Sequence, residues 1–337
     1  MHPIVALILL LLLLAGPIAA APLERNIEFY FLGLGLLAIV LAGRLNWEIL
    51  FDATRAPILI AAAVAAAGLI FGAVRNRLDR LFERLESKIS RPYLTALSVF
   101  VIAMLSSVVT AIVAALLLVE TIGLLRLPER PRIGVAVSGC FAIGLGASLT
   151  PLGEPLATLA AHAMGLPFLG LFRLLGLYTM PGILFCSAIA GFFARKWELD
   201  RAEIPHVEER SHDVLMQTIK VYAFVAGLVL VSDAFAPLAT QYVNRMSAPK
   251  LFWLNTISAA LDNATLVALE VHRMDAGRAR AAIIALLVSG GMLIPGNVPN
   301  IVSAGLLRIG SLAWAKVGIP MGLVMMTAYF LVLTWRG

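Results

Sequence analysis

Charged side chains are scarce in this chain of 337 residues. Asp, Glu, Lys and Arg make up 14% of it, whereas 61% of the residues are hydrophobic. A soluble domain carries about 25% charged residues, so this composition excludes soluble globular folds. Apolar runs of roughly 18 to 25 residues recur along the chain, which is the length that a helix needs to cross a bilayer. We therefore predict an all-α polytopic membrane protein.

Cysteine and histidine are also rare, with 2 and 5 residues respectively. Cys140 and Cys186 lie in apolar runs without a Cys-x-x-Cys motif, which argues against a disulfide framework and a zinc site. The His-Glu-x-x-His and Gly-x-Gly-Asp motifs of intramembrane proteases are absent, as is a Gly-x-Ser motif paired with an intramembrane histidine. We expect no enzyme, no cofactor and no metal other than a transported ion.

The net charge of +6 could indicate a nucleic-acid partner. In a membrane protein, however, Lys and Arg gather in cytoplasmic loops, so we expect contacts with lipids and none with nucleic acid.

The apolar and polar stretches divide the chain into successive parts. We predict N-terminal transmembrane helices at 1–74, an amphipathic cytoplasmic linker at 75–92, a first core at 93–170, connecting transmembrane helices and a cytoplasmic loop at 171–246, a second core at 247–310 and a C-terminal transmembrane helix at 311–337. Full spans are expected near 28–43, 56–74, 171–194, 214–236 and 318–335. Residues 3–20 could be a signal peptide, but they lack a basic start, and the topology below favours a retained span.

Two features of the second core are costly inside a membrane. Asp262 and Asn263 sit in the middle of an apolar segment, and a later apolar segment is interrupted by Pro295, Gly296, Asn297 and Pro299. An ionisable residue and a broken helix at membrane depth each indicate a functional site. Together they predict an ion pathway.

The first core resembles the second. LSSVVTAIVAALLLVE at 105–120 aligns with ISAALDNATLVALEVH at 257–272, VSGC at 137–140 with VSGG at 288–291, and Pro151 and Pro155 with Pro295 and Pro299. Repeats with interrupted helices in matching positions are typical of secondary transporters. We predict two inverted repeats, each with a re-entrant hairpin (93–125 and 247–275) and a broken helix (133–165 and 281–308), and about eight full spans besides the two hairpins.

Charge counting gives this arrangement a direction. It places most of the 26 Lys and Arg residues on the side of 75–92, 126–132 and 195–213. That side is predicted to be cytoplasmic.

Asp262 is the strongest candidate for chemistry. A buried carboxylate binds its proton more tightly, so a proton and a metal cation can compete for it near neutral pH. Asn263, Thr265 and the carbonyl groups at a hairpin tip would complete an all-oxygen shell for a hard cation. Alternatively, Asp262 forms a structural hydrogen bond to the facing hairpin and Asn263 caps a helix.

Glu154, inside the Pro151–Pro155 break, is the second candidate. It could assist Asp262, or it could cap the half-helix that begins there, because acids favour helix N-termini. Serine and threonine hydroxyls in membrane helices often bond back to their own backbone instead of a ligand. The supporting substrate site is predicted to contain Ser106, Ser107, Thr110, Thr150, Pro151, Gly153, Pro295, Asn297, Pro299 and Asn300.

Three motifs resemble those of the ion transporter superfamily, which includes D-type sodium/proton antiporters, arsenite permeases and citrate or divalent-anion symporters. They are GASLTPLGEP at 146–155, SAALDNATLVA at 258–268 and SGGMLIPGNVPN at 289–300. The likeness is greatest to a small family of predicted cation transporters in that group. It implies the inverted repeats and a homodimer. The first hairpin departs from the symporter pattern, with Ser-Ser-x-x-Thr in place of Ser-Asn-Thr.

The leading hypothesis is therefore a cation/proton antiporter of the bacterial inner membrane that exchanges Na+ or Li+ for protons. An anion or organic-acid symporter or oxyanion exporter of the same superfamily is the alternative. A channel or a non-transporting membrane scaffold is a more remote one.

Overall fold

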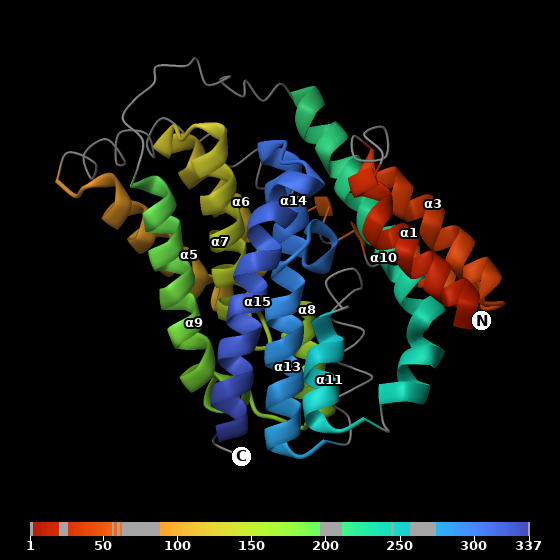
Figure 1. Cartoon of the computed structure of the whole chain (residues 1–337). Coiled ribbons are helices and arrows are strands. Elements are labelled where there is room, and N and C mark those ends of the chain that lie inside the picture. Colours follow the sequence, from red (N-terminus) through yellow and green to blue (C-terminus); the bar gives the residue numbers. More distant parts are fainter. Residues whose placement is uncertain are drawn as a thin grey trace.

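The computed structural model describes residues 3–19, 26–55, 57–58, 61–62, 88–195, 211–243, 246–256 and 274–335. These residues form helices joined by short turns, and no strand occurs among them (Figure 1). The predicted all-α fold is confirmed for this part of the chain. Most of the predicted linker (75–87) and the centre of the second predicted hairpin (257–273) lie outside the described residues.

Four described segments are long and apolar enough to cross a membrane, judged by length and composition alone. They lie in α5 (Arg91–Val109), α9 (Gly170–Ala194), α10 (Ser211–Val243) and α15 (Ser311–Trp335). Shorter apolar segments lie in α1 (Pro3–Ala19), α3 (Ile27–Leu41), α6 (Ala111–Leu125) and α14 (Val298–Leu307). This composition fits an integral membrane protein, while the number of full spans stays a prediction.

Two helix boundaries differ from the predicted ones. The span predicted at 214–236 continues through Pro237 to Val243, and the span predicted at 318–335 begins at Ser311. Proline is a weak stop signal at membrane depth, because neighbouring helices and local backbone adjustments compensate for the hydrogen bond it removes.

The first predicted hairpin is present as α5 and α6, which contact each other and meet at Thr110. A Cβ on Gly191, near the end of α9, would lie 2.6 Å from the Pro92 carbonyl oxygen at the start of α5. A Cβ on Gly134, near the start of α7 (Glu129–Ala147), would lie 2.3 Å from the Phe193 ring, also near the end of α9. Since α6 ends at Leu125, beside the start of α7, both arms of the hairpin have their outer ends here. We call this the Arg126 end.

The second broken helix begins at the opposite end of α9. Arg280, in the first turns of α13 (Ala276–Gly291), donates to the Leu174 carbonyl oxygen at 3.1 Å, and its guanidinium lies 4.9 Å from the Tyr178 ring centre. Leu174 and Tyr178 belong to the first turns of α9. We call this the Arg280 end. Because α7 begins at the Arg126 end and α13 at the Arg280 end, the two helices run in opposite directions (Figure 1).

The two flanks of residues 257–273 also meet at the Arg280 end. Arg278 donates to the Met246 carbonyl oxygen. Met246 and Met274 both pack against Leu251 of α11 (Ala248–Leu254) and Ala282 of α13. Met246 and Met274 therefore lie at one end of the molecule, the end opposite to the base of the first hairpin.

The pairing of VSGC with VSGG is wrong. Val137 lies ten residues before the end of α7, whereas Val288 lies in the last turn of α13. Pro151 and Pro295, in contrast, each follow the end of their helix by four residues, while the internal repeat stays a prediction. The two VSG motifs match only in composition, because small residues serve close helix packing at many positions of membrane helices.

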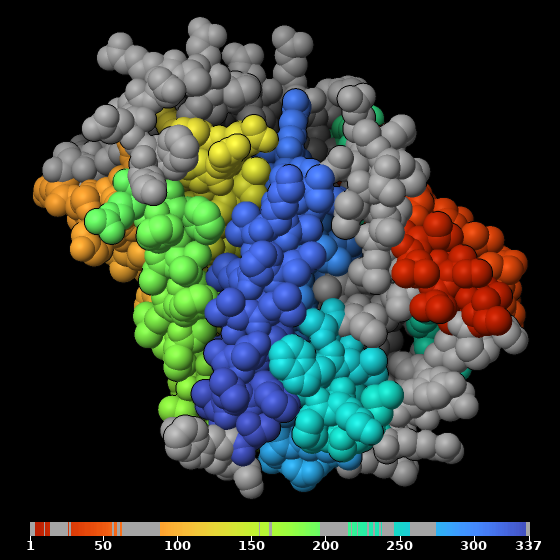
Figure 2. Space-filling model, viewed as in Figure 1, coloured from red at the N-terminus to blue at the C-terminus, as the bar shows by residue number. Residues whose placement is uncertain are grey.

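Helices α1, α3 and α10 form a separate group at one edge of the molecule (Figure 1), and Figure 2 shows α1 and α3 in red and orange at that edge. Here α3 and α10 pack extensively in parallel, with the Phe31 and Phe224 rings stacked at 4.8 Å. A Cβ on Gly35 would lie 2.5 Å from the Gly227 carbonyl oxygen, so glycine permits the close approach. The group reaches the remaining helices mainly through α10 against α14 and α1 against α15.

Candidate functional site

The tip of the first hairpin is a single residue. Thr110 has φ 89° and ψ 150°, ends α5 and precedes α6. The Ser106 hydroxyl donates to the Ala103 carbonyl oxygen at 2.7 Å and lies 3.1 Å from that of Ile143 in α7. The Ser107 hydroxyl donates to the Met104 carbonyl oxygen at 2.8 Å. Both serines thus bond back to their own helix, as the alternative interpretation predicts, and Ser106 also ties α5 to α7.

The first break docks onto this tip. The Thr150 hydroxyl donates to the Ser107 carbonyl oxygen, and the Ala111 backbone amide donates to the Gly153 carbonyl oxygen at 2.7 Å. Gly153 has no room for a side chain, because a Cβ there would lie 2.0 Å from the Ala147 carbonyl oxygen. The structure therefore brings together five of the predicted site residues: Ser106, Ser107, Thr110, Thr150 and Gly153.

Glu154 is buried at the edge of this junction, with 7% of its surface exposed. It directly precedes α8 (Pro155–Ala163), and the Thr158 hydroxyl lies 2.5 Å from the Pro151 carbonyl oxygen and 3.3 Å from that of Glu154. This position agrees with a carboxylate at a helix N-terminus. It also places Glu154 beside Gly153 and close to Thr150 in sequence, so the capping interpretation and the site interpretation both predict this position.

The second break has a different construction. α13 ends at Gly291, the 3-10 turn η2 covers Ile294–Gly296, and α14 begins at Val298 after an extended Asn297. The Asn300 side-chain amide donates to the carbonyl oxygens of Gly290 at 2.7 Å and Leu293 at 2.8 Å. The buried Trp314 indole donates to the Gly291 carbonyl oxygen at 3.2 Å. Side chains thus satisfy carbonyl groups that the end of a helix otherwise leaves without partners.

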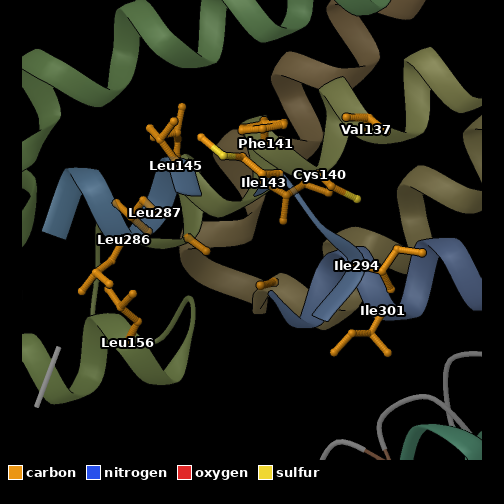
Figure 3. Packing of buried hydrophobic residues seen from close by; sticks show 14 of the residues in the cluster. Val137, Cys140, Phe141, Ile143, Leu145, Leu156, Leu286, Leu287, Ile294 and Ile301 are labelled. Atoms are coloured by element: carbon orange, nitrogen blue, oxygen red, sulfur yellow. The ribbon is translucent and has the colours of Figure 1, made fainter. Parts of the chain in front are cut away.

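The second break packs against the last turns of α7. Asn297 reaches Gly144, where a Cβ would lie 3.0 Å from the Asn297 side-chain nitrogen. The buried Cys140 thiol lies 3.5 Å from the Pro299 carbonyl oxygen and 3.3 Å from the Ser303 hydroxyl. Figure 3 shows the surrounding apolar side chains of α7, α13, η2 and α14 in one cluster. One helix, α7, therefore touches both breaks.

The described hairpin tip and the two breaks carry few charged side chains. Residues 106–111, 148–155 and 292–300 hold no Arg, Lys or His, and Glu154 is their one acid. No group of three or more His, Cys, Asp and Glu side chains that could hold a metal occurs within the described ranges. Asp262, Asn263 and Thr265 lie outside the described residues, so their predicted convergence with Glu154 stays a prediction.

Several contacts at this site were not predicted from the sequence. They are the Asn300 and Trp314 bonds to the end of α13, the Cys140 contact with α14, and the tight packing of Gly144 on Asn297 and of Gly146 on Ala103. Gly139, Gly144 and Gly146 lie in one helix, and frequent small residues in a membrane helix indicate close approach of its neighbours. The partners of these residues, in contrast, have no sequence signal.

The chain belongs to the family described as "Protein of unknown function (DUF1646)", which matches residues 4–336. The match spans nearly the whole chain, and its description assigns no activity. No curated protein matches the chain.

Proposed function

We propose that this family member is a cation/proton antiporter that exchanges Na+ or Li+ for protons across a membrane. The observation that carries the proposal is the docking of a hairpin tip on a helix break through Thr150 with Ser107 and Ala111 with Gly153. Such a junction gathers hydroxyl and carbonyl oxygens between buried helices, and hard cations prefer oxygen ligands.

Asp262 is the residue proposed to carry the exchange. Met246 and Met274, which flank the segment that contains it, both lie at the Arg280 end, and the sequence pairs its tip with that of the first hairpin. A second tip docked on the second break would bring Asp262 close to Asn297. The deprotonated carboxylate would bind the cation, and protonation would release it, so one site serves both ions in turn. Glu154 would assist from the first break.

A cation fits this site better than an anion. Anion sites favour Arg, Lys or free backbone amides, and the described tip and breaks hold neither Arg nor Lys. The observation that favours the anion alternative is the N-terminus of α14, where the cap residue Asn297 makes no side-chain capping hydrogen bond. An oxyanion or dicarboxylate could accept from such amides. The assay below therefore includes an anion arm.

The test uses everted membrane vesicles that contain the protein and hold a respiration-generated pH gradient. Addition of Na+ or Li+ should collapse the gradient, while K+, Ca2+, arsenite and a dicarboxylate should not. Asp262→Asn should abolish the response, because the amide cannot exchange a proton. Asp275→Asn is the matched control, since Asp275 is an exposed acid that caps α13. If no cation collapses the gradient, or if Asp262→Asn responds like the wild type, the antiporter proposal is wrong.

A further inference from the structure

Asn300 has more hydrogen-bonding capacity than its structural role requires. It lies in the first turn of α14 with 0% of its surface exposed. Its amide nitrogen donates to two carbonyl oxygens, those of Gly290 and Leu293. Because both bonds need N–H groups, they fix the orientation of the amide. The side-chain oxygen must then point away from these two carbonyl groups.

That oxygen is a buried acceptor which receives no hydrogen bond in the described part of the chain. Buried polar atoms in native proteins nearly always have a partner, so an exception indicates strain, a bound water or a ligand such as an ion. Capping alone does not explain the choice of asparagine, because Trp314 caps Gly291 at the same helix end through a donor without adding an acceptor. The extra oxygen of Asn300 therefore needs a role of its own.

The residues around Asn300 in the sequence indicate which kind of ligand its side-chain oxygen would bind. Residues 281–307, which form most of α13, η2 and all of α14, contain no charged side chain. The free side-chain oxygen of Asn300 carries partial negative charge, and hard cations prefer such oxygen ligands. Divalent cations are usually held by several carboxylates, and the described residues of the second break supply none, so the amide oxygen here suits a monovalent cation.

We propose that the side-chain oxygen of Asn300 is a direct ligand of the transported Na+ or Li+ at the second break. The inference rests on the proposed function and adds a ligand of known orientation. Asn300 then has two tasks, which are separable: its nitrogen holds the end of α13, and its oxygen binds the ion.

The test compares two variants that lose the same donors. Asn300→Leu and Asn300→Asp both remove the bonds to Gly290 and Leu293, but only Asn300→Asp keeps an oxygen. Trp314→Phe removes a neighbouring donor and leaves Asn300 intact. The purified full chain is heated in NaCl, LiCl or choline chloride at constant ionic strength, and the midpoint Tm is recorded. A bound cation raises Tm by mass action.

All three variants should unfold at a lower Tm than the wild type in choline chloride. The Na+-dependent rise in Tm should persist in Trp314→Phe and Asn300→Asp. In Asn300→Leu the apparent Kd for Na+ should rise by about tenfold or more. If Asn300→Leu does not fold, Asn300→Ser serves instead, since it draws the oxygen back and should also weaken Na+ binding.

Two results separate this inference from the function on which it rests. If Na+ stabilises the wild type and Asn300→Leu equally, or fails to stabilise Asn300→Asp as well, the ligand role of Asn300 is wrong and the antiporter proposal stands. If neither Na+ nor Li+ stabilises the wild type and the vesicles do not respond, both fail.

Discussion

Thr110 holds a backbone conformation that threonine rarely adopts. At φ 89° and ψ 150° it lies close to a region populated almost only by glycine. A residue held there costs about 1–3 kcal/mol, and the surrounding contacts must supply that energy. The Ala111 to Gly153 hydrogen bond and the Thr150 to Ser107 bond lie directly beside it. The tip is therefore strained by the same docking that assembles the candidate site.

Replacing Thr110 with glycine should relieve this strain. We expect Thr110→Gly to raise the free energy of unfolding by about 1 kcal/mol, because the relief exceeds the entropic cost of glycine. Thr110→Ala, which also lacks the hydroxyl but keeps a Cβ, should not stabilise the chain. Thermal unfolding of both purified variants measures the difference. Equal Tm values for the two would show that the backbone is not strained.

A substitution of Glu154 distinguishes the two interpretations of this residue, a role in exchange and a cap of α8. If it takes part in exchange, Glu154→Gln should lower cation-dependent collapse of the pH gradient on the order of tenfold or more, since proton transfer groups contribute at least that much. If it only caps α8, the amide should cap nearly as well, with exchange unchanged and Tm slightly lower. Vesicle assays at matched expression decide between them.

The sequence predicted those site residues whose chemistry permits few structural roles. Proline lacks an amide donor, so Pro151 and Pro295 marked both breaks, and Glu154 was notable because an acid in an apolar run is costly. Thr110 gave no turn signal, since threonine is not a turn residue in this region of backbone conformation. The Asn300 bonds were beyond prediction, because they depend on how two helix ends approach.

At the scale of helices, α5 and α7 approach closely through glycine. A Cβ on Gly146 would lie 1.9 Å from the Ala103 carbonyl oxygen and 2.9 Å from the Ser106 side-chain oxygen. The nearer atom belongs to the backbone of α5, so it cannot move without shifting the whole helix. This contact holds the arm of the hairpin against the broken helix.

Alanine should therefore have opposite effects at two glycines of the first core. Gly146→Ala should destabilise the chain by about 1–3 kcal/mol through overpacking and should weaken exchange by separating α5 from α7. Gly123→Ala, in α6, meets nothing within 4 Å and should stabilise by about 0.5–1 kcal/mol through helix propensity. Unfolding midpoints of the two variants give the comparison. A stable Gly146→Ala would mean that α5 can move aside at no cost.

The sequence predicted which segments are helical better than it predicted where each helix ends. The all-α class followed from composition, and the break positions followed from proline pairs. The span predicted at 214–236 was too short, because the helix continues past Pro237 with the support of neighbouring helices. The hairpin base at the Arg280 end, defined by Met246 and Met274, agrees with the predicted course of 247–275, whose centre the described residues do not include.

At the scale of the whole molecule, the two ends should face opposite sides of the membrane. Exposed Arg130 lies at the Arg126 end and exposed Gly277 at the Arg280 end. Both natural cysteines are buried and free, so they should react little with a membrane-impermeant maleimide. Arg130→Cys and Gly277→Cys variants therefore report on each end separately.

With the Arg126 end in the cytoplasm, as the distribution of basic residues predicts, intact cells should label Gly277→Cys and spare Arg130→Cys. Everted vesicles should show the reverse. Mass spectrometry of the purified protein detects the adduct. Labelling of both positions from one side would contradict the opposed orientation of the two hairpin bases.

The one-residue junction at Thr110 also limits how the chain can vary in length. Each residue added to a helix turns everything after it by about 100°, so an insertion between α5 and α6 would rotate the α6 face away from α14 and α7. A longer loop elsewhere can absorb an extra residue, whereas this tip has none to spare. Related chains should therefore align through 106–111 without gaps, and a single-residue insertion or deletion there should be tolerated less than one near Gly165, in the turn between α8 and α9.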